Sequence, residues 1–456
     1  MVIARRIALR SGLCGLMALA ISPAVKAEVT IYKSPKWDVF TRGRVQAFVS
    51  YAAGDAIPPI LVLNSPDGPV DAPYRGGGIG LGEALSDAPQ NEFGNIETTR
   101  VRSGFTGNIF GFGVRHPLGE DMLLTGYIHI NAVIESVDRR KFETVEPDVR
   151  QGYLELAGSW GSVLAGRALT LFSRGATEIT YLYGFQYGLG FSPAPDNLGP
   201  TNGHIGFGVL ANGFSAGFVY TTPDLAGFKL AAGIYDPSGI VGSPWERTKY
   251  PRPEGELTYD LNFGSGLIHL FVNGAWQKIY ERNNTRDVTV SGVGYGGRFE
   301  VGPVHLGLAG HTGVGLGISY AFDPTEATYG SPDQNSELRS FDGYYGQLQI
   351  ALGKLDLMAG AGITRVKPLV YDRVDSVDDD GDVNTPPIND DSDASVNDPL
   401  PFNLLKHQLG FSGGLVYHIA DNLHFDIDYF RADFRWQLAE RKQIINFVNS
   451  GLTFDW

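Results

Sequence analysis

The sequence of 456 residues has one cysteine, four methionines and no long apolar run in its main part. A single cysteine cannot form an intramolecular disulfide or a multi-thiolate metal site. Mean hydropathy is −0.08, which leaves no room for a bundle of apolar spanning helices. Basic residues number 36 against 50 acidic ones, so the basic footprint of a nucleic-acid-binding protein is missing. Aromatic residues make up 12%, which excludes general disorder.

Residues 1–27 differ from the rest of the chain because they contain basic residues and no acidic ones. Arg5, Arg6 and Arg10 precede an apolar run at residues 12–21, and Ala27 ends a stretch with small residues at the cleavage positions. This pattern predicts a secretory signal peptide that is removed before Glu28. Loss of these residues leaves 32 basic residues against 50 acidic ones, a net charge of −18, and removes the cysteine.

What the remaining chain does contain is alternation of period two, which is typical of strands with two different faces. In residues 122–137 the even positions are apolar or small, whereas His129 and Asn131 lie between them. Sixteen such segments are predicted: 37–51, 96–114, 122–137, 148–157, 162–169, 206–221, 227–236, 254–263, 267–279, 290–301, 304–320, 340–352, 355–366, 403–418, 423–436 and 443–456.

The connections between these segments alternate in length along the chain. The short ones are 116–121, 158–161, 222–226, 264–266, 302–303, 353–354 and 419–422, and each is followed by a longer one. Every second connection of an up-and-down barrel lies at the same rim, so this alternation predicts an all-β antiparallel transmembrane barrel with turns at one rim and loops at the other. Closure removes the unpaired strand edges that lipid cannot solvate. A soluble secreted sandwich or propeller is the alternative, but it would not require alternating loop lengths.

Four sequence features resemble the Gram-negative porins. They are Arg42–Phe48 after the signal peptide, Gly166–Leu169 leading into Leu171–Gly175, the hairpin Phe218–Phe228, and an aromatic last strand that ends at Trp456. The resemblance implies one domain over residues 28–456, a homotrimer of sixteen-stranded barrels in the outer membrane, and contact with lipid and lipopolysaccharide. It also implies passive diffusion of small hydrophilic solutes and ions, no cofactor, and an inward-folded third long loop, here 170–205. Most members end in Phe rather than Trp.

The charge at the narrowest point of a pore sets which ions pass. The resemblance places basic residues on the lumen wall opposite acidic residues of the third loop, and alternation with the neighbouring apolar residues predicts which arginines face inward. Arg100 and Arg102 alternate with Val101 and Ile109, and Arg167 faces the lumen if Leu164 faces out. The candidate wall residues are Arg42, Arg44, Arg100, Arg102 and Arg167, and the candidate loop residues are Arg174, Glu178 and Asp196.

Two loops offer alternative functions. Aromatic residues between Tyr181 and Phe191 either anchor the third loop or form a path for sugars, which would make the channel substrate-selective. The loop 367–402 is strongly acidic, and Asp378, Asp380 and Asp382 resemble a calcium loop, although position twelve is Asn389 instead of Glu. An acidic solvated loop without calcium is the simpler interpretation. No G-x-S-x-G nucleophile motif is present, and the sequence predicts that the protein is not an enzyme.

Overall fold

The computed structural model describes most of the chain after the predicted signal peptide. The described residues are 28–55, 61–65, 68–72, 74–75, 96–104, 107–132, 147–179, 204–211, 213–238, 245, 247–283, 285–322, 337–369, 403–437 and 442–456. The predicted signal peptide, Asp196 and the possible calcium residues lie outside them.

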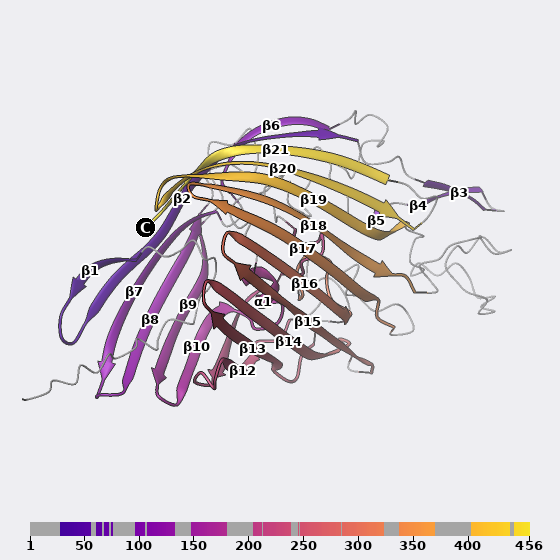
Figure 1. The fold of residues 1–456 in the computed structure, drawn as a ribbon. Helices are drawn as coiled ribbons and strands as arrows, with labels where there is room; N and C mark the ends of the chain where they lie inside the picture. Colours follow the sequence, from indigo (N-terminus) through magenta and orange to yellow (C-terminus); the bar gives the residue numbers. More distant parts are fainter. Residues whose placement is uncertain are drawn as a thin grey trace, which may run out of the picture.

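The described strands form one closed antiparallel barrel with sixteen positions, because β6 and β7 together occupy one position (Figure 1). This confirms the predicted fold class. The barrel strands are β2 (Asp38–Gly54), β6 (Ile96–Arg102), β7 (Asn108–Leu118), β8 (Met122–Ala132), β9 (Asp148–Gly158), β10 (Gly161–Leu169), β11 (Phe214–Thr221), β12 (Phe228–Tyr235), β13 (Arg252–Phe263), β14 (Gly266–Tyr280), β15 (Asp287–Val301), β16 (Val304–Val314), β17 (Ser340–Leu352), β18 (Leu355–Lys367), β19 (Asn403–Ala420), β20 (Leu423–Trp436) and β21 (Lys442–Asp455).

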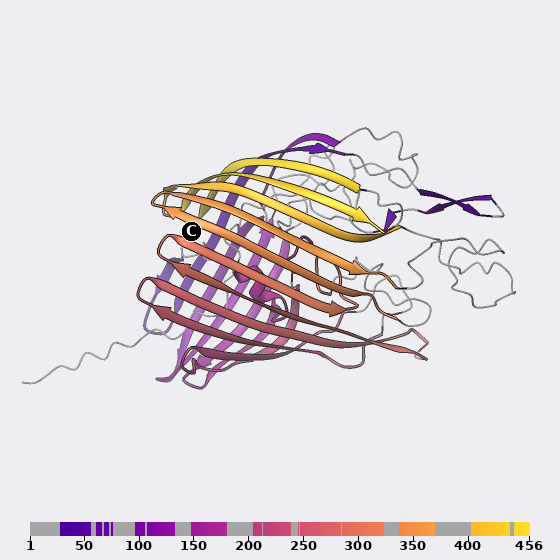
Figure 2. The same cartoon turned by 45° about the vertical axis from the view of Figure 1, so that its right-hand side comes forward.

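The predicted short connections all join neighbouring barrel strands, and these tight turns lie at one end of the barrel (Figure 2). We call this end the turn rim and the opposite end the loop rim. Four small strands lie outside the sixteen barrel positions. β1 (Val29–Lys33) pairs with β2 at the turn rim, β5 (Tyr74–Arg75) pairs with β19, and β3 (Leu61–Ser65) pairs with β4 (Gly68–Ala72) in a separate sheet. The sequence pattern did not predict them.

The barrel closes between its first and last strands. β2 pairs with β21 from Arg44↔Asp455 to Gly54↔Ile445. Beyond the end of β21, Trp456 exchanges two backbone hydrogen bonds with Gly43, and its indole occupies the space where a side chain at position 43 would lie. Glycine at position 43 therefore allows the terminal aromatic ring to pack on the seam.

Alternation along the strands separates an apolar outer face from a largely polar inner face. Large apolar side chains such as Val49, Val272 and Leu452 are exposed outside, whereas Asn273 and Asn449 point inward and are buried. No helix among the described residues is long and apolar enough to cross a membrane. The described helix, α1 (Arg174–Glu178), lies inside the ring, where it contacts β14, β15 and β16.

One predicted strand, 96–114, is interrupted between β6 and β7. Arg102 faces inward and Val101 outward in β6, whereas Phe110 faces outward in β7. Even positions thus change from inward to outward across the break, where the side chain of Asn108 accepts a hydrogen bond from the backbone of Gln46. Ile109 is paired with Arg44 and faces inward, so the prediction that it shares a face with Val101 was wrong.

Two predicted strands extend too far toward the loop rim. The segment 206–221 is a strand only from Phe214, and the segment 304–320 is a strand only to Val314. The neighbouring residues 204–211 and 315–322 turn into the barrel, where most of their apolar side chains are buried. Alternating apolar residues occur in both arrangements, so period two did not distinguish them.

Candidate pore lining

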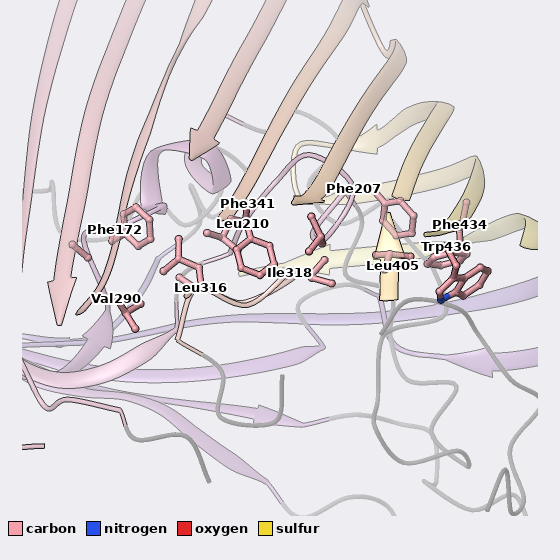
Figure 3. Packing of buried hydrophobic residues seen from close by; sticks show 14 of the residues in the cluster. Phe172, Phe207, Leu210, Val290, Leu316, Ile318, Phe341, Leu405, Phe434 and Trp436 are labelled. Carbon is pink, nitrogen blue, oxygen red and sulfur yellow. The ribbon is translucent and has the colours of Figure 1, made fainter. Parts of the chain in front are cut away.

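The inner surface near the loop rim is covered by three chain segments, 170–179, 204–211 and 315–322, which we call the inner segments. They bury an apolar cluster against the wall (Figure 3). Phe172, Phe207, Leu210, Leu316 and Ile318 come from the inner segments and pack against the following wall residues: Val290, Phe341, Leu405, Phe434 and Trp436. Burial of these apolar side chains holds the inner segments against the wall. The rest of the lumen is filled with water.

Polar groups of β13 and β14 hold the first inner segment. The backbone N–H of Phe172 donates to Glu254 Oε2 at 2.7 Å, and that of Ser173 donates to Asn273 Oδ1 at 3.1 Å. Glu254 is also paired with Arg252, with 2.8 Å between Arg252 Nε and Glu254 Oε1. The Arg252 guanidinium lies 4.2 Å from the ring centroid of Phe322, so this one pair contacts two inner segments.

The second inner segment is attached to β18 and β19. His204 Nε2 lies 2.7 Å from Ser412 Oγ, and the backbone N–H of Gly208 donates to Thr364 Oγ1 at 2.9 Å. The carbonyl oxygen of Phe207 occupies the space that a Cβ at Gly362 would need. Glycine in the wall therefore permits backbone-to-backbone approach here.

The second and third inner segments are joined to each other by backbone hydrogen bonds. The N–H of Ala211 donates to the carbonyl of Ser319 at 2.8 Å, and the N–H of Ala321 donates to the carbonyl of Ala211 at 2.9 Å. Residues from two long connections therefore form one structure inside the barrel.

Arg42 and Arg44 face inward near the turn rim, as their alternation with Val45 predicts. Arg44 Nε lies 2.7 Å from Asp455 Oδ1, and both side chains are 2% exposed. Arg42 pairs with Glu28, which also accepts hydrogen bonds from Arg115. Burial alone would raise the pKa of the Glu28 carboxyl, but the hydrogen bonds from the two arginines outweigh it and hold this pKa below its usual range.

Arg100 and Arg102 also lie on the inner face, in the half of the wall nearer the loop rim. They are register partners of Ser50 and Phe48, whose side chains are buried inside the barrel. Arg102 is fully buried. Its burial means that it does not present a freely hydrated charge to a passing ion.

Arg167 does not face the lumen, and its predicted place on the inner wall was wrong. It is the register partner of Ala216, on the same outer face as the exposed Phe218, and its own side chain is exposed. Leu164 instead packs against the inner cluster of Phe40 and its neighbours. Arg167 was predicted to face the lumen on the condition that Leu164 faces outward. Leu164 faces inward, so this condition is not met.

Of the predicted loop residues, Arg174 lies on the first inner segment and pairs with Glu256 on the wall. Glu178 lies in α1, but its side chain is outside the described residues, as are Asp196 and the aromatic run 181–191. The acidic positions Asp378, Asp380 and Asp382 are also outside them.

Near the turn rim, the wall carries a polar belt that the sequence pattern did not single out. Asp260 is paired with His269 at 2.7 Å, and Arg298 with Glu300 at 3.0 Å. The belt continues through side-chain contacts between neighbouring strands up to the seam. Its members are Asp260, His269, Arg298, Glu300, His305, Gln349, Asp356, His418, His424, Asp455 and Arg44. Inward parity near a short turn, already visible in the sequence for His269 and His424, could have identified them.

A family model for Gram-negative porins matches residues 16–434. The outer-membrane channel DcaP of Acinetobacter baumannii is similar over 94% of this chain and all of its own, with 14% identity and a TM-score of 0.59. The anion-selective porin of Comamonas acidovorans is similar over 92% of this chain and all of its own, with 11% identity and a TM-score of 0.55. A comparison with curated protein sequences found no match.

The family match covers most of the chain, and the two structural neighbours share its closed barrel. The expected resemblance is thereby confirmed. The apolar outer face fits the interior of a lipid bilayer, and the polar belt fits a water-filled lumen. The chain belongs to the Gram-negative porins and is a diffusion channel of the outer membrane.

Proposed function

We propose that this porin conducts small hydrophilic solutes and ions past the polar belt, with charge rather than one dedicated solute setting the preference. The observation that carries the proposal is that belt side chains of both signs keep part of their surface exposed: 19% for Asp260, 22% for Arg298 and 25% for Glu300. Alternating charges with access to water orient a polar solute, whereas an apolar solute would have to displace that water.

Planar-bilayer recording tests the proposal directly. The refolded mature protein is expected to give stepwise conductance increments, and sugars, amino acids and small anions tested at millimolar concentration are expected to leave the open-channel current unblocked. Barrel-sized protein that inserts without current steps would contradict the channel. Saturable block by one sugar alone would favour the substrate-selective alternative, which rests on the aromatic run 181–191.

Removing two exposed belt acids is expected to change ion selectivity. Asp260→Asn with Glu300→Gln deletes two negative charges at side chains that contact lumen water, so the reversal potential in a salt gradient should shift toward anion preference. Asp148→Asn is the matched control, because Asp148 is 52% exposed at the start of β9 and salt screens its charge. An equal shift in both variants would place the selectivity outside the belt.

Assembly and partners follow the same proposal. Trimeric porins are the precedent for a homotrimer here, and the apolar outer face supports contact with outer-membrane lipid. Arg365 and Lys367, both largely exposed at the loop rim, provide cations for lipopolysaccharide phosphates. The absence of enzymatic activity remains a prediction from the sequence, as does an acidic solvated loop without a cofactor, to which calcium binding is the alternative.

A further inference from the structure

The strongest unassigned feature of the lumen is a pair of histidines that face each other within the polar belt. His418 of β19 and His424 of β20 flank the short turn 421–422, and their Nδ1 atoms are 3.0 Å apart. The His418 side chain is 35% exposed, so the pair can be reached from the water of the lumen. None of the functions described above uses this contact.

The opposite nitrogen of each ring faces a carboxylate. His418 Nε2 lies 2.9 Å from Asp356 Oδ2, and His424 Nε2 lies 3.8 Å from Asp455 Oδ2. The Asp455 side chain is 2% exposed, and its Oδ2 has no hydrogen-bond donor among the described residues. Arg44 neutralises the other oxygen of this carboxylate.

The arrangement allows a tautomer in which unprotonated ring nitrogens face each other. Two neutral imidazoles carry two N–H groups, and one N–H per ring can point toward its carboxylate, at 2.9 Å for His418 and 3.8 Å for His424. If the N–H of each ring points to its carboxylate, the two Nδ1 lone pairs face each other. A cation between the rings satisfies both lone pairs.

We propose that His418 and His424 bind a divalent transition-metal ion of the zinc class through their Nδ1 atoms. Metal-binding histidines commonly donate their other N–H to a carboxylate, which is the position of Asp356 and Asp455. Tetrahedral zinc with Zn–N bonds of about 2.0–2.1 Å requires a nitrogen separation of about 3.3 Å, so the rings need to move apart only slightly.

The site is open on the lumen side. Within the described part of the chain, no group of three or more His, Cys, Asp or Glu residues is arranged to hold a metal ion. The two imidazoles therefore supply two ligands, and water fills the remaining positions. An open site of this kind exchanges its metal with the lumen and adds positive charge to the belt when it is filled.

Calorimetric titration of the refolded mature protein with Zn²⁺ at pH 7.5 tests the proposal independently of channel activity. One zinc per chain is expected to bind at this site, with an affinity that His418→Gln and His424→Gln each weaken about tenfold or more. His269→Gln is the matched control, because His269 is also paired with a lumen carboxylate but has no second imidazole beside it. Its zinc affinity should equal that of the wild type.

Asp356→Asn separates a positioning role from ligation. This substitution keeps both nitrogen ligands and should weaken zinc binding by about tenfold. In bilayers, Zn²⁺ should reduce cation current in the wild type and not in His424→Gln. Equal zinc affinity in all histidine variants, or an equal effect of Mg²⁺, would overturn the proposal without affecting the conclusion that the protein conducts ions.

Discussion

Arg44→Met is expected to lower the free energy of unfolding by about 3–5 kcal/mol, because it leaves the carboxylate of Asp455 buried without its charged partner. The two side chains are each 2% exposed and connect the first and last barrel strands. Urea unfolding of the refolded protein in detergent, followed by the gel mobility of the heat-modifiable barrel, measures the change.

Two further variants show whether the loss arises from the unpaired charge. Arg44→Met with Asp455→Leu removes both charges and should recover most of the stability, since apolar pairs often replace buried ion pairs at little cost. Arg42→Met should have a small effect, because its partner Glu28 is 24% exposed and retains Arg115. A double variant as unstable as Arg44→Met would show that the guanidinium acts through packing instead.

Glu254→Ala is expected to release the inner segments from the wall. Glu254 is fully buried, and its loss removes the acceptor of the Phe172 N–H and the ionised partner of Arg252. Breaking a buried pair in this way lowers stability by about 3–5 kcal/mol. Single-channel recording should show frequent current fluctuations in place of steady steps, because the segments that line the lumen no longer keep one position.

Glu254→Gln is the graded control, since the amide oxygen can still accept the Phe172 hydrogen bond while the charge is lost. Its channels should fluctuate less than those of Glu254→Ala. Steady wild-type steps in the alanine variant would mean that the apolar cluster alone fixes the inner segments.

Period-two alternation, together with the alternating lengths of the connections, was enough to predict the barrel, its short turns and the inward direction of Arg42 and Arg44. It could not predict their partners, because Asp455 and Arg44 are 411 residues apart and meet only when the ring closes. The break between β6 and β7 changed the parity of Ile109, and its local signal is the pair Gly104 and Gly107, the second of which has a φ of 68°. The face that a strand residue occupies is predicted from the face assigned to a neighbouring residue. Leu164 was assigned to the wrong face, and Arg167 was therefore misplaced.

The same alternation also hid the inner segments. Ile205, Phe207 and Val209 repeat at every second position as in a strand, yet all three are buried inside the barrel. The difference lies in what covers them: Phe207 lies against the wall at Gly362 and Gly410, and Ile205 and Val209 belong to a buried cluster with Phe271, Ala309 and Tyr345. Glu254 and Glu256 lie in a correctly predicted strand. Their contacts with the first inner segment depend on the path of a loop, which the sequence pattern did not predict.

The seam between β2 and β21 has a consequence for the order of events during biogenesis. The strand that enters the periplasm first can complete its hydrogen bonds only after the final strand arrives, since its register partners run from Ile445 to Asp455. Until then β2 has an unpaired edge at which other chains can add. Contacts of such long sequence separation form slowly. The first barrel strand of this porin therefore keeps an exposed edge for the whole time that its last strand is still in transit.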